Sequence, residues 1–561
     1  MRGYRLLGFS FLLALDACAG GRPAESPAPR GGGATSAAIS PADLRLRISI
    51  FADDSMQGRR TGTPGNIKGN AYIAGELARL GLRPAGDSGT FLQRVPLTSY
   101  AVDPARATLR AGSTNLGAFE AYYPFQPDFT VPVRKIDGAQ LIYIGGAGDS
   151  AGIPSREALQ GKVVLFRSHG GANSLGAPDL SPGGRLGLIA GIAITEIDPL
   201  IGNFDQFLRT PKIVVDQEVS VPAGVTQPRM LFIPTGSVPQ LFGKPLDQLR
   251  AGETGPTLQG DVAFDPSDLT STNVVAVLEG SDPALRGEYV ALGAHNDAIG
   301  LVSPPVDHDS LRAYNTVIRP RGANDPPGQP SEEQWTRILG LLDSLQGGRP
   351  ARPDSIVNGA DDDGSGSMGL LEVAEALMQG TRPKRSLLFV WHTGEESGLQ
   401  GSRWFTDHPT VPRDSIVAQL NVDMIARGGP NDESKGGPGY IQAIGTRRLS
   451  TELGDLTETV NREGKHGLVF DYTYDADGHP DNFYCRSDHY MYARYGIPIA
   501  FFSTGDHRDY HQVTDEPQYL DYEKYARVTR FLADLARRVG DFDHRPVVDK
   551  PKPDPDAPCR Q

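Results

Sequence analysis

Several short segments of this chain place residues that can bind metal at the end of a hydrophobic run or at the start of a helix. Apolar runs at 289–294, 387–391, 417–422 and 497–502 are followed by His, Asp or Glu, in the last case by a Tyr-His pair a few residues on. The segment 358–366 is instead an acidic, glycine-rich loop before a helical pattern. Binding sites of open α/β sheets form at the carboxyl ends of the strands. The sequence therefore predicts an α/β domain whose His and acidic residues meet at one edge of a sheet.

The adjacent acids Glu395 and Glu396 are the most informative pair, because they follow the buried run at 387–391. Burying carboxylates without partners costs free energy, and a metal ion would offset that cost. Where a strand ends, the backbone turns and both side chains can reach one cleft. One carboxylate can then bind a metal while the other stays free as a base. Two acids on a solvated turn are the alternative, and the other segments favour the metal.

Taken together, these segments resemble the di-zinc aminopeptidases of clan MH. The motifs occur in the order of that family: His-x-Asp, Gly-Ala-Asp-Asp-Asp-Gly-Ser-Gly, Gly-Glu-Glu, Asn-x-Asp-Met and a late Tyr-His. The group also contains secreted bacterial leucine-type aminopeptidases, glutamate carboxypeptidase II and the non-enzymatic transferrin receptor. The resemblance extends from about residue 44 to residue 539. It implies a mixed-sheet α/β/α zinc exopeptidase domain.

The resemblance also implies a site with two zinc ions. Asp362 would bridge the ions. His295 and Asp423 would complete the protein ligands of one ion, and Glu396 and His511 those of the other. Imidazole and carboxylate groups are ordinary zinc ligands, and catalytic zinc sites keep a position open for water.

Three further residues receive roles from the same resemblance. Glu395 would take a proton from the attacking water and deliver it to the leaving amine. The hydroxyl of Tyr510 would steady the oxyanion. Asp297 would accept the second ring N–H of the nearby His ligand and so fix its tautomer; a turn-capping Asp is the alternative. Family members also hold the bridging Asp before a cis peptide bond, which here would join Asp362 and Asp363.

Other histidines could compete for the late ligand position. His511 is preferred because Asp-Tyr-His, with an Asp downstream, matches the family spacing. His489 lies in a Ser-Asp-His segment that supports the pocket in the family, and His507 follows Gly-Asp. We expect His308 to be a solvated loop residue.

Serine and cysteine hydrolase chemistry fits the sequence poorly. No Gly-x-Ser-x-Gly motif stands at a strand-to-helix turn, and Cys485 lacks the local signature of a catalytic thiol. Cys485 and Cys559 either form a disulfide in an oxidising compartment or remain free thiols.

An aminopeptidase acting on peptides is the preferred function. A carboxypeptidase or dipeptidase could use the same site, and the family also includes glutaminyl-cyclase-like transferases and receptor-like binding proteins. A non-catalytic relative would be expected to lose ligands or the base, and here all are present. The net charge of −13 and the pI near 5.4 argue against nucleic-acid binding. The sequence leaves the oligomeric state open.

The N-terminus is typical of an exported protein. Arginines precede an apolar run at 6–15, which is too short to span a membrane as a mature helix. Residues 1–18 resemble a lipoprotein signal region in which Cys18 becomes the lipidated first residue. The Gly-, Ala-, Pro- and Ser-rich stretch 19–40 then predicts a flexible linker. We expect a bacterial cell-envelope protein whose membrane contact is the lipid at Cys18, or a secreted protein.

The remaining chain divides into a discontinuous zinc peptidase domain, 41–130 and 265–540, and a disordered tail, 541–561. Between the two peptidase segments, 131–264 resembles the β-rich protease-associated domain inserted in many family members. The Pro-rich segment 299–357 is longer than in compact members, and long segments beside a site often serve as lids or specificity loops. Helices are expected near 69–80, 332–345 and 525–539, and short strands near 141–144, 162–166 and 192–194.

Overall fold

A computed structural model describes most of the chain. The described residues are 35–125, 133–146, 154–167, 184, 186–195, 208–215, 229–428 and 437–561. The predicted signal region, Cys18 and most of the linker lie outside them. Among the described helices, none combines the length and the apolar character needed to cross a bilayer.

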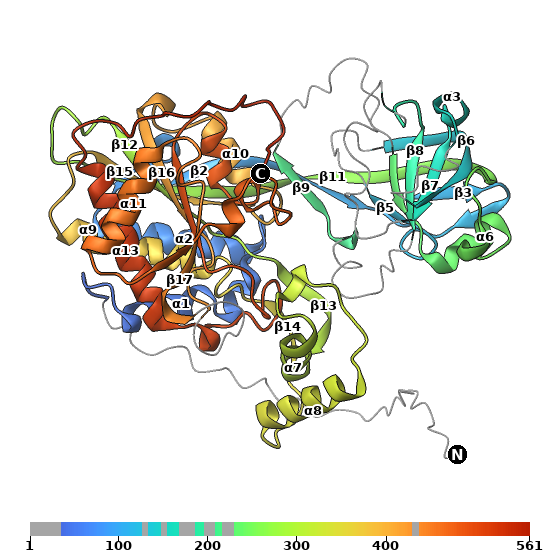
Figure 1. The fold of residues 1–561 in the computed structure, drawn as a ribbon, viewed down its shortest axis with the longest axis horizontal. Coiled ribbons are helices and arrows are strands. Elements are labelled where there is room, and N and C mark those ends of the chain that lie inside the picture. Colours follow the sequence, from blue (N-terminus) through green and yellow to red (C-terminus); the bar gives the residue numbers. More distant parts are fainter. Residues whose placement is uncertain are drawn as a thin grey trace. The chain divides into compact units, whose positions relative to one another are not determined.

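A mixed β-sheet organises the peptidase domain (Figure 1). Its parallel strands carry the segments singled out in the sequence: β12 pairs with β15 and with β16, and β16 pairs with β19. The C-terminal half of β11 runs antiparallel to β15, and β17 runs antiparallel to β19. The bounds are β11 (Thr254–Leu278), β12 (Tyr289–His295), β15 (Ser386–His392), β16 (Ile416–Val422), β17 (Tyr440–Ile444) and β19 (Ile499–Ser503).

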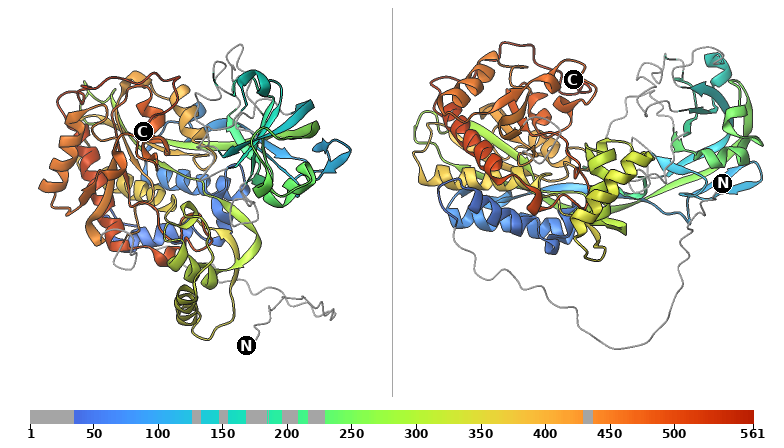
Figure 2. Two further views of the ribbon diagram at one scale, coloured as in Figure 1. Left: turned by 45° about the vertical axis from the view of Figure 1, so that its right-hand side comes forward. Right: turned by 60° about the horizontal axis from the view of Figure 1, so that its bottom comes forward.

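Helices cover both faces of this sheet, as successive views show (Figures 1 and 2). Side chains alternate between the faces along a strand. In β15, Phe389 and Trp391 belong to one hydrophobic cluster, whereas Leu388 and Val390 belong to another. The first cluster includes residues of α1 (Pro41–Phe51), α2 (Pro64–Leu80), α9 (Gly364–Gln379) and α13 (Tyr522–Gly540), and the second includes residues of α10 (Gln400–Asp407) and α12 (His489–Ala493). The predicted α/β/α layers are thereby confirmed.

A second hydrophobic core belongs to the inserted domain and extends from Ala107 to Phe264. The sequence placed the start of this domain at 131, but β5 already pairs with β10, and β3 with β11. The strands that join β3 and β5 to the rest of the domain, β11 and β10, are distant in the chain, so local patterns could not reveal the boundary. The strands are β3 (Thr108–Ala111), β4 (Thr114–Leu116), β5 (Tyr123–Phe125), β6 (Val133–Gly146), β7 (Val163–Arg167), β8 (Gly191–Thr195) and β10 (Arg229–Phe232).

Two further strands, β2 and β9, belong to the same sheet as β11. The long β2 (Leu92–Val102) pairs antiparallel with β11, and the short β9 (Lys212–Val215) pairs with β2.

The long segment 299–357 forms a hairpin with two helices between its strands. β13 (Gly300–Asp307) and β14 (Pro353–Val357) pair antiparallel, and α7 (His308–Ile318) and α8 (Glu332–Gln346) lie between them in the chain. The expectation of a solvated His308 is wrong: this residue begins α7 and is 1% exposed. Its ring stacks on that of Tyr519, which is distant in the chain, with centroids 5.8 Å apart.

The tail 541–561 has no helix or strand, yet contacts fix it along its length, where the sequence predicted disorder. Arg545 forms an ion pair with Glu288 at 2.8 Å, and the side chain of Gln561 donates to the carbonyl of Tyr474 at 3.0 Å. Cys559 forms a disulfide with Cys485. These partners are distant in sequence, which is why composition alone suggested a free tail.

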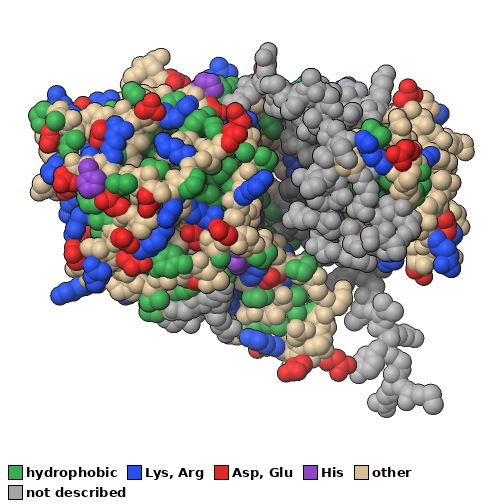
Figure 3. Space-filling view, turned by 45° about the horizontal axis from the view of Figure 1, so that its top comes forward, with side chains coloured by type: hydrophobic (Ala, Val, Ile, Leu, Met, Phe, Trp, Pro, Cys, Tyr) green, Lys and Arg blue, Asp and Glu red, His purple; other side chains and the backbone are tan. Residues whose placement is uncertain are grey.

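Figure 3 shows one face of the molecule with acidic and basic side chains interspersed over the peptidase domain.

Candidate metal centre

His295, Asp362 and Asp423 form the first cluster of potential metal ligands. His295 is the last residue of β12, Asp423 follows β16, and Asp362 lies in the loop that precedes α9. One ligand atom of each lies within 4.8 Å of the others. His295 Nε2 is 3.1 Å from Asp362 Oδ1 and 3.6 Å from Asp423 Oδ1.

Asp362, Glu396 and His511 form the second cluster. His511 Nε2 is 2.9 Å from Asp362 Oδ2 and 3.0 Å from Glu396 Oε2. Asp362 therefore belongs to both clusters and turns one carboxylate oxygen toward each. This is the arrangement expected of a ligand that bridges two ions.

The charges in the two clusters fit bound cations. Asp423 Oδ1 and Glu396 Oε1 are buried without a hydrogen-bond partner among the described residues. Burial raises the pKa of Glu396 and of Asp423. Burial alone would lower the pKa of His511, but Glu396 and Asp362 raise it to about 10. Unpaired buried carboxylates are costly, and imidazole with carboxylate is a donor set that zinc prefers, so these residues fit two zinc-class ions.

Glu395 lies beside the centre but belongs to neither cluster. Its Oε2 is 3.9 Å from His295 Nε2, and its side chain is 12% exposed. Burial, with the nearby carboxylates of Asp423 and Glu396, raises its pKa well above the ordinary value. A carboxylate held close to a metal site without ligating it is suited to accept a proton.

Asp297 supports the site differently from the prediction. His295 Nδ1 lies 3.1 Å from the backbone carbonyl oxygen of Asp297, whereas the nearer carboxylate oxygen is 3.7 Å away. The carboxylate instead accepts hydrogen bonds from the Thr61 hydroxyl at 2.6 Å and from the Glu395 backbone N–H at 3.2 Å. The chain turns immediately after β12, and this turn brings the carbonyl back to the imidazole. The carboxylate is thereby free to fix the turn that carries Glu395.

Two other aspartates tie the ligand-bearing loops together through backbone groups. Asp363 accepts the N–H of His295 at 3.0 Å with Oδ2 and the N–H of Met424 at 3.1 Å with Oδ1. Asp515 accepts the N–H of Asp362 at 3.1 Å. The peptide bond between Asp362 and Asp363 is cis, as the family resemblance implied. The sequence indicated neither set of backbone bonds, because the partners are far apart in the chain.

Tyr510 is buried, and its ring stacks on His511 with centroids 3.9 Å apart. Its hydroxyl accepts a hydrogen bond from Arg486 Nη2 at 3.3 Å. The sequence did not point to Arg486, although this residue directly precedes the Ser-Asp-His segment of the family pattern. The first residue of that segment, Ser487, donates to Asp423 Oδ2 at 2.8 Å.

The competing histidines belong to neither cluster. His507 Nε2 is 3.3 Å from Asp361 Oδ2. His489 stacks on Phe501 with centroids 4.3 Å apart, and burial lowers its pKa to about 3. These positions support the choice of His511 as the late ligand.

The segment 299–357 holds the loop that carries Tyr510 and His511. Arg312 of α7 forms an ion pair with Asp509. The N–H of Ala323 donates to the carbonyl of Tyr510 at 3.1 Å. The segment therefore contacts the backbone next to a predicted ligand.

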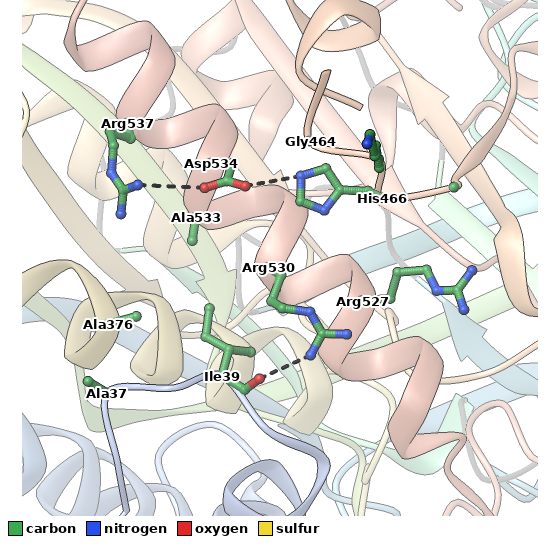
Figure 4. A pocket seen from close by; sticks show the side chains of 12 residues that line it. Ala37, Ile39, Ala376, Gly464, His466, Arg527, Arg530, Ala533, Asp534 and Arg537 are labelled. Atoms are coloured by element: carbon green, nitrogen blue, oxygen red, sulfur yellow. Dashed lines mark hydrogen bonds and ion pairs between the residues drawn. The ribbon is translucent and has the colours of Figure 1, made fainter. Parts of the chain in front are cut away.

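A separate pocket of about 590 Å³ contains none of these ligands. His466 and Arg537 flank Asp534 in it, and Arg530 donates to the carbonyl of Ile39 at 3.0 Å (Figure 4).

Comparisons with known proteins agree with this geometry. Residues 273–536 match the model of Peptidase family M28. Leupeptin-inactivating enzyme 1 of Streptomyces exfoliatus is 32% identical over 164 residues, which cover 28% of this chain and 32% of that protein. Leucine aminopeptidase 1 of Coccidioides posadasii is 33% identical over 150 residues, which cover 26% and 36%. The aligned part of this chain thus spans about a third of the length of either relative.

Among solved structures, an aminopeptidase from Aneurinibacillus sp. strain AM-1 shares the fold. Its TM-score is 0.53 at 17% identity, and the match covers 92% of this chain and 97% of that one. The family match contains His295, Asp362, Glu396, Asp423 and His511. The part of the chain that carries both clusters, residues 273–536, therefore belongs to peptidase family M28, which confirms the relationship to the di-zinc aminopeptidases of clan MH.

Proposed function

We propose that this protein is a zinc-dependent aminopeptidase. The observation that carries the proposal is the sharing of Asp362 by two His/acid clusters, with Glu395 beside them and in neither. The names of the leucine aminopeptidase relatives support the same reaction.

His295, Asp362 and Asp423 would hold one zinc ion, and Asp362 would share the second with Glu396 and His511. When bound, the ions would lower the pKa of a water molecule and stabilise negative charge on the substrate oxygen.

The chain's own groups would complete the reaction. Glu395 would accept the proton of the water at its carboxylate and donate it to the departing amine nitrogen. The Tyr510 hydroxyl, held by Arg486, would face the oxygen of the scissile carbonyl. The Asp297 carboxylate would keep the backbone of Glu395 in place. The acidic site would also attract the positively charged α-amine of a peptide.

The substrate class can be tested with leucine p-nitroanilide and its N-acetyl derivative, with zinc content measured on the same preparation. We expect cleavage of the free-amine substrate, little cleavage of the blocked one, and loss of activity on chelation that added zinc restores. Equal rates on both substrates, or cleavage only of substrates with a free C-terminal carboxylate, would contradict an aminopeptidase. Cyclisation of N-terminal glutamine would identify a transferase, and zinc binding without any turnover would identify a binding protein.

We also propose that the inserted domain, whose core extends from Ala107 to Phe264, is of the protease-associated type and contacts longer peptides. Substitutions on its surface should then raise KM for long peptides more than for leucine p-nitroanilide. An equal effect on both substrates would indicate that the domain only supports folding.

For location, we propose export to the cell envelope with a lipid on Cys18. Cys18→Ala should move the protein from the membrane fraction to the soluble fraction. A wild-type protein that is already soluble and begins at another residue would contradict the lipid anchor.

A further inference from the structure

A third cluster of potential ligands lies outside the candidate metal centre. It consists of His308 at the start of α7, Asp354 in β14, and Glu516. One ligand atom of each lies within 4.8 Å of the others. None of these residues belongs to the two clusters described above, and nothing in the proposed reaction uses them.

His308 is the buried member of this cluster, and one of its ring nitrogens has no partner. Nδ1 is 3.2 Å from Asp309 Oδ1 and 2.5 Å from Arg352 Nη2. Nε2 is buried and has no hydrogen-bond partner among the described residues. With Nδ1–H directed at Asp309 Oδ1, the lone pair of the neutral ring lies on Nε2, which is then the nitrogen available to a ligand. A carboxylate beside the other ring nitrogen is the arrangement that commonly orients a metal-binding His.

The protonation of His308 is compatible with metal binding. Burial, and next the Arg352 guanidinium, lower the pKa of this imidazole. The neutral ring keeps a lone pair that an ion can use. Arg352 itself is bonded to Asp309 Oδ1 at 2.9 Å, so its charge is directed to that carboxylate.

The two acids of the cluster have no cationic partner. Among the described residues, no ion pair joins Asp354 or Glu516 to a Lys or Arg side chain. Asp354 Oδ1 accepts the backbone N–H of Ile356 at 3.0 Å. Glu516 Oε1 accepts from Asn358 Nδ2 at 3.2 Å, and that amide also donates to Asp54 Oδ1 at 2.8 Å. Two carboxylates thus lie close to a buried imidazole, an arrangement that a divalent cation would stabilise.

We propose that His308, Asp354 and Glu516 bind a third divalent cation of the zinc class. One imidazole and two carboxylates match the ligands that zinc uses, with water able to fill a fourth position. Calcium and magnesium prefer sites built only from oxygen atoms. The inference does not depend on the proposed peptidase reaction.

This ion would be structural. Two of its ligands belong to the segment 299–357, and Glu516 directly follows Asp515, which accepts the N–H of Asp362. Asn358, which donates to Glu516, stands at the start of the loop that carries Asp362. The cation would therefore fasten the long segment to the backbone that positions the bridging aspartate.

The test is the zinc content of purified protein after equilibration with buffered Zn²⁺, measured by mass spectrometry of the metal. Glu516→Gln keeps the shape of the side chain and weakens it as a ligand. We expect it to lose one equivalent of zinc, both in the wild-type background and in Glu396→Ala, which lowers binding at the other site. His466→Ala is the matched control. The His466 side chain is also largely buried and lies beside the carboxylate of Asp534, but it belongs to none of the three ligand clusters. The zinc content of this variant should therefore equal that of the wild type.

Unchanged zinc content in Glu516→Gln would overturn the inference. If the variant does not fold, anomalous diffraction at the zinc edge from wild-type crystals decides: a peak within bonding distance of His308 Nε2 supports the site, and its absence refutes it. If the wild type holds a single ion and Glu516→Gln removes it, the third site stands while the proposed di-zinc function fails. If Glu516→Gln binds as much zinc as the wild type, whereas Asp362→Asn binds two equivalents less, the function stands and the third site fails.

Discussion

Replacing Glu395 with Gln removes one proton acceptor and leaves the shape of the side chain nearly unchanged. An amide cannot accept the proton of water at neutral pH. The carboxylates of Asp362, Glu396 and Asp423 belong to the two clusters, and that of Asp297 already accepts from Thr61 and the Glu395 N–H. The full contribution of general-base catalysis should therefore be lost, a decrease in kcat of about 10²–10⁴-fold. This corresponds to about 3–5 kcal/mol of transition-state stabilisation.

The neighbouring Glu396 provides the matched comparison. Since it lies 3.0 Å from His511 in the second cluster, Glu396→Ala should lower zinc content as well as kcat. Glu395→Gln should keep the zinc content of the wild type, with KM close to normal. The assay is steady-state hydrolysis of leucine p-nitroanilide, combined with metal analysis of each variant. A Glu395→Gln enzyme with near-normal kcat would refute the mechanism, even if zinc were found at both sites.

Three further predictions concern stability. Arg47 is 1% exposed and pairs with three glutamates. Arg47→Met should therefore lower the free energy of unfolding, measured by chemical denaturation, by about 3–5 kcal/mol. A change below about 1 kcal/mol, typical of surface substitutions, would contradict the buried network. Cys559→Ser opens the disulfide to Cys485, which spans a sequence separation of 74. The loop-entropy relation predicts that the free energy of unfolding falls by about 4 kcal/mol. Equal unfolding midpoints of the wild type with and without reductant would contradict this contribution of the disulfide. Burial lowers the pKa of His489 to about 3. Below its ordinary value near 6.5 the unfolded chain binds a proton that the folded chain does not, so stability should fall by about 2 kcal/mol between pH 6.5 and 5. His489→Phe, which keeps an aromatic ring against Phe501, should flatten this part of the profile, and an unchanged profile would refute the assignment.

The sequence allowed most residues of the two clusters to be predicted because they stand near a strand end or a helix start, whereas His511 lies in a loop beyond β19 and was chosen from the family spacing. An apolar run followed by His295, by Asp423 or by the Glu395–Glu396 pair can be recognised from the residues next to it in the sequence. Parallel strands then bring their carboxyl ends to the same edge without further information.

Contacts between distant segments could not be predicted in this way. Arg486 contacts Tyr510 through a side chain alone, and nothing in its neighbours indicates that partner. Asp297 was assigned the correct neighbour, but its backbone carbonyl, and not its carboxylate, lies closer to His295. The buried His308 stacks on Tyr519, a residue distant in the chain, and the sequence around His308 does not indicate that contact.

The conformation of His511 explains why the long segment 299–357 belongs with the site. Its φ of 56° lies in the left-handed region, which residues other than glycine seldom occupy. Such a backbone persists only where its surroundings hold it. Here the carbonyl of Tyr510 accepts the N–H of Ala323, and Asp509 is paired with Arg312 from α7 and with Arg427 at 2.8 Å. Since Ala323 and Arg312 both come from the long segment, that segment helps to aim the imidazole at Asp362 and Glu396, and substitutions within it should reach the metal centre through the backbone of His511.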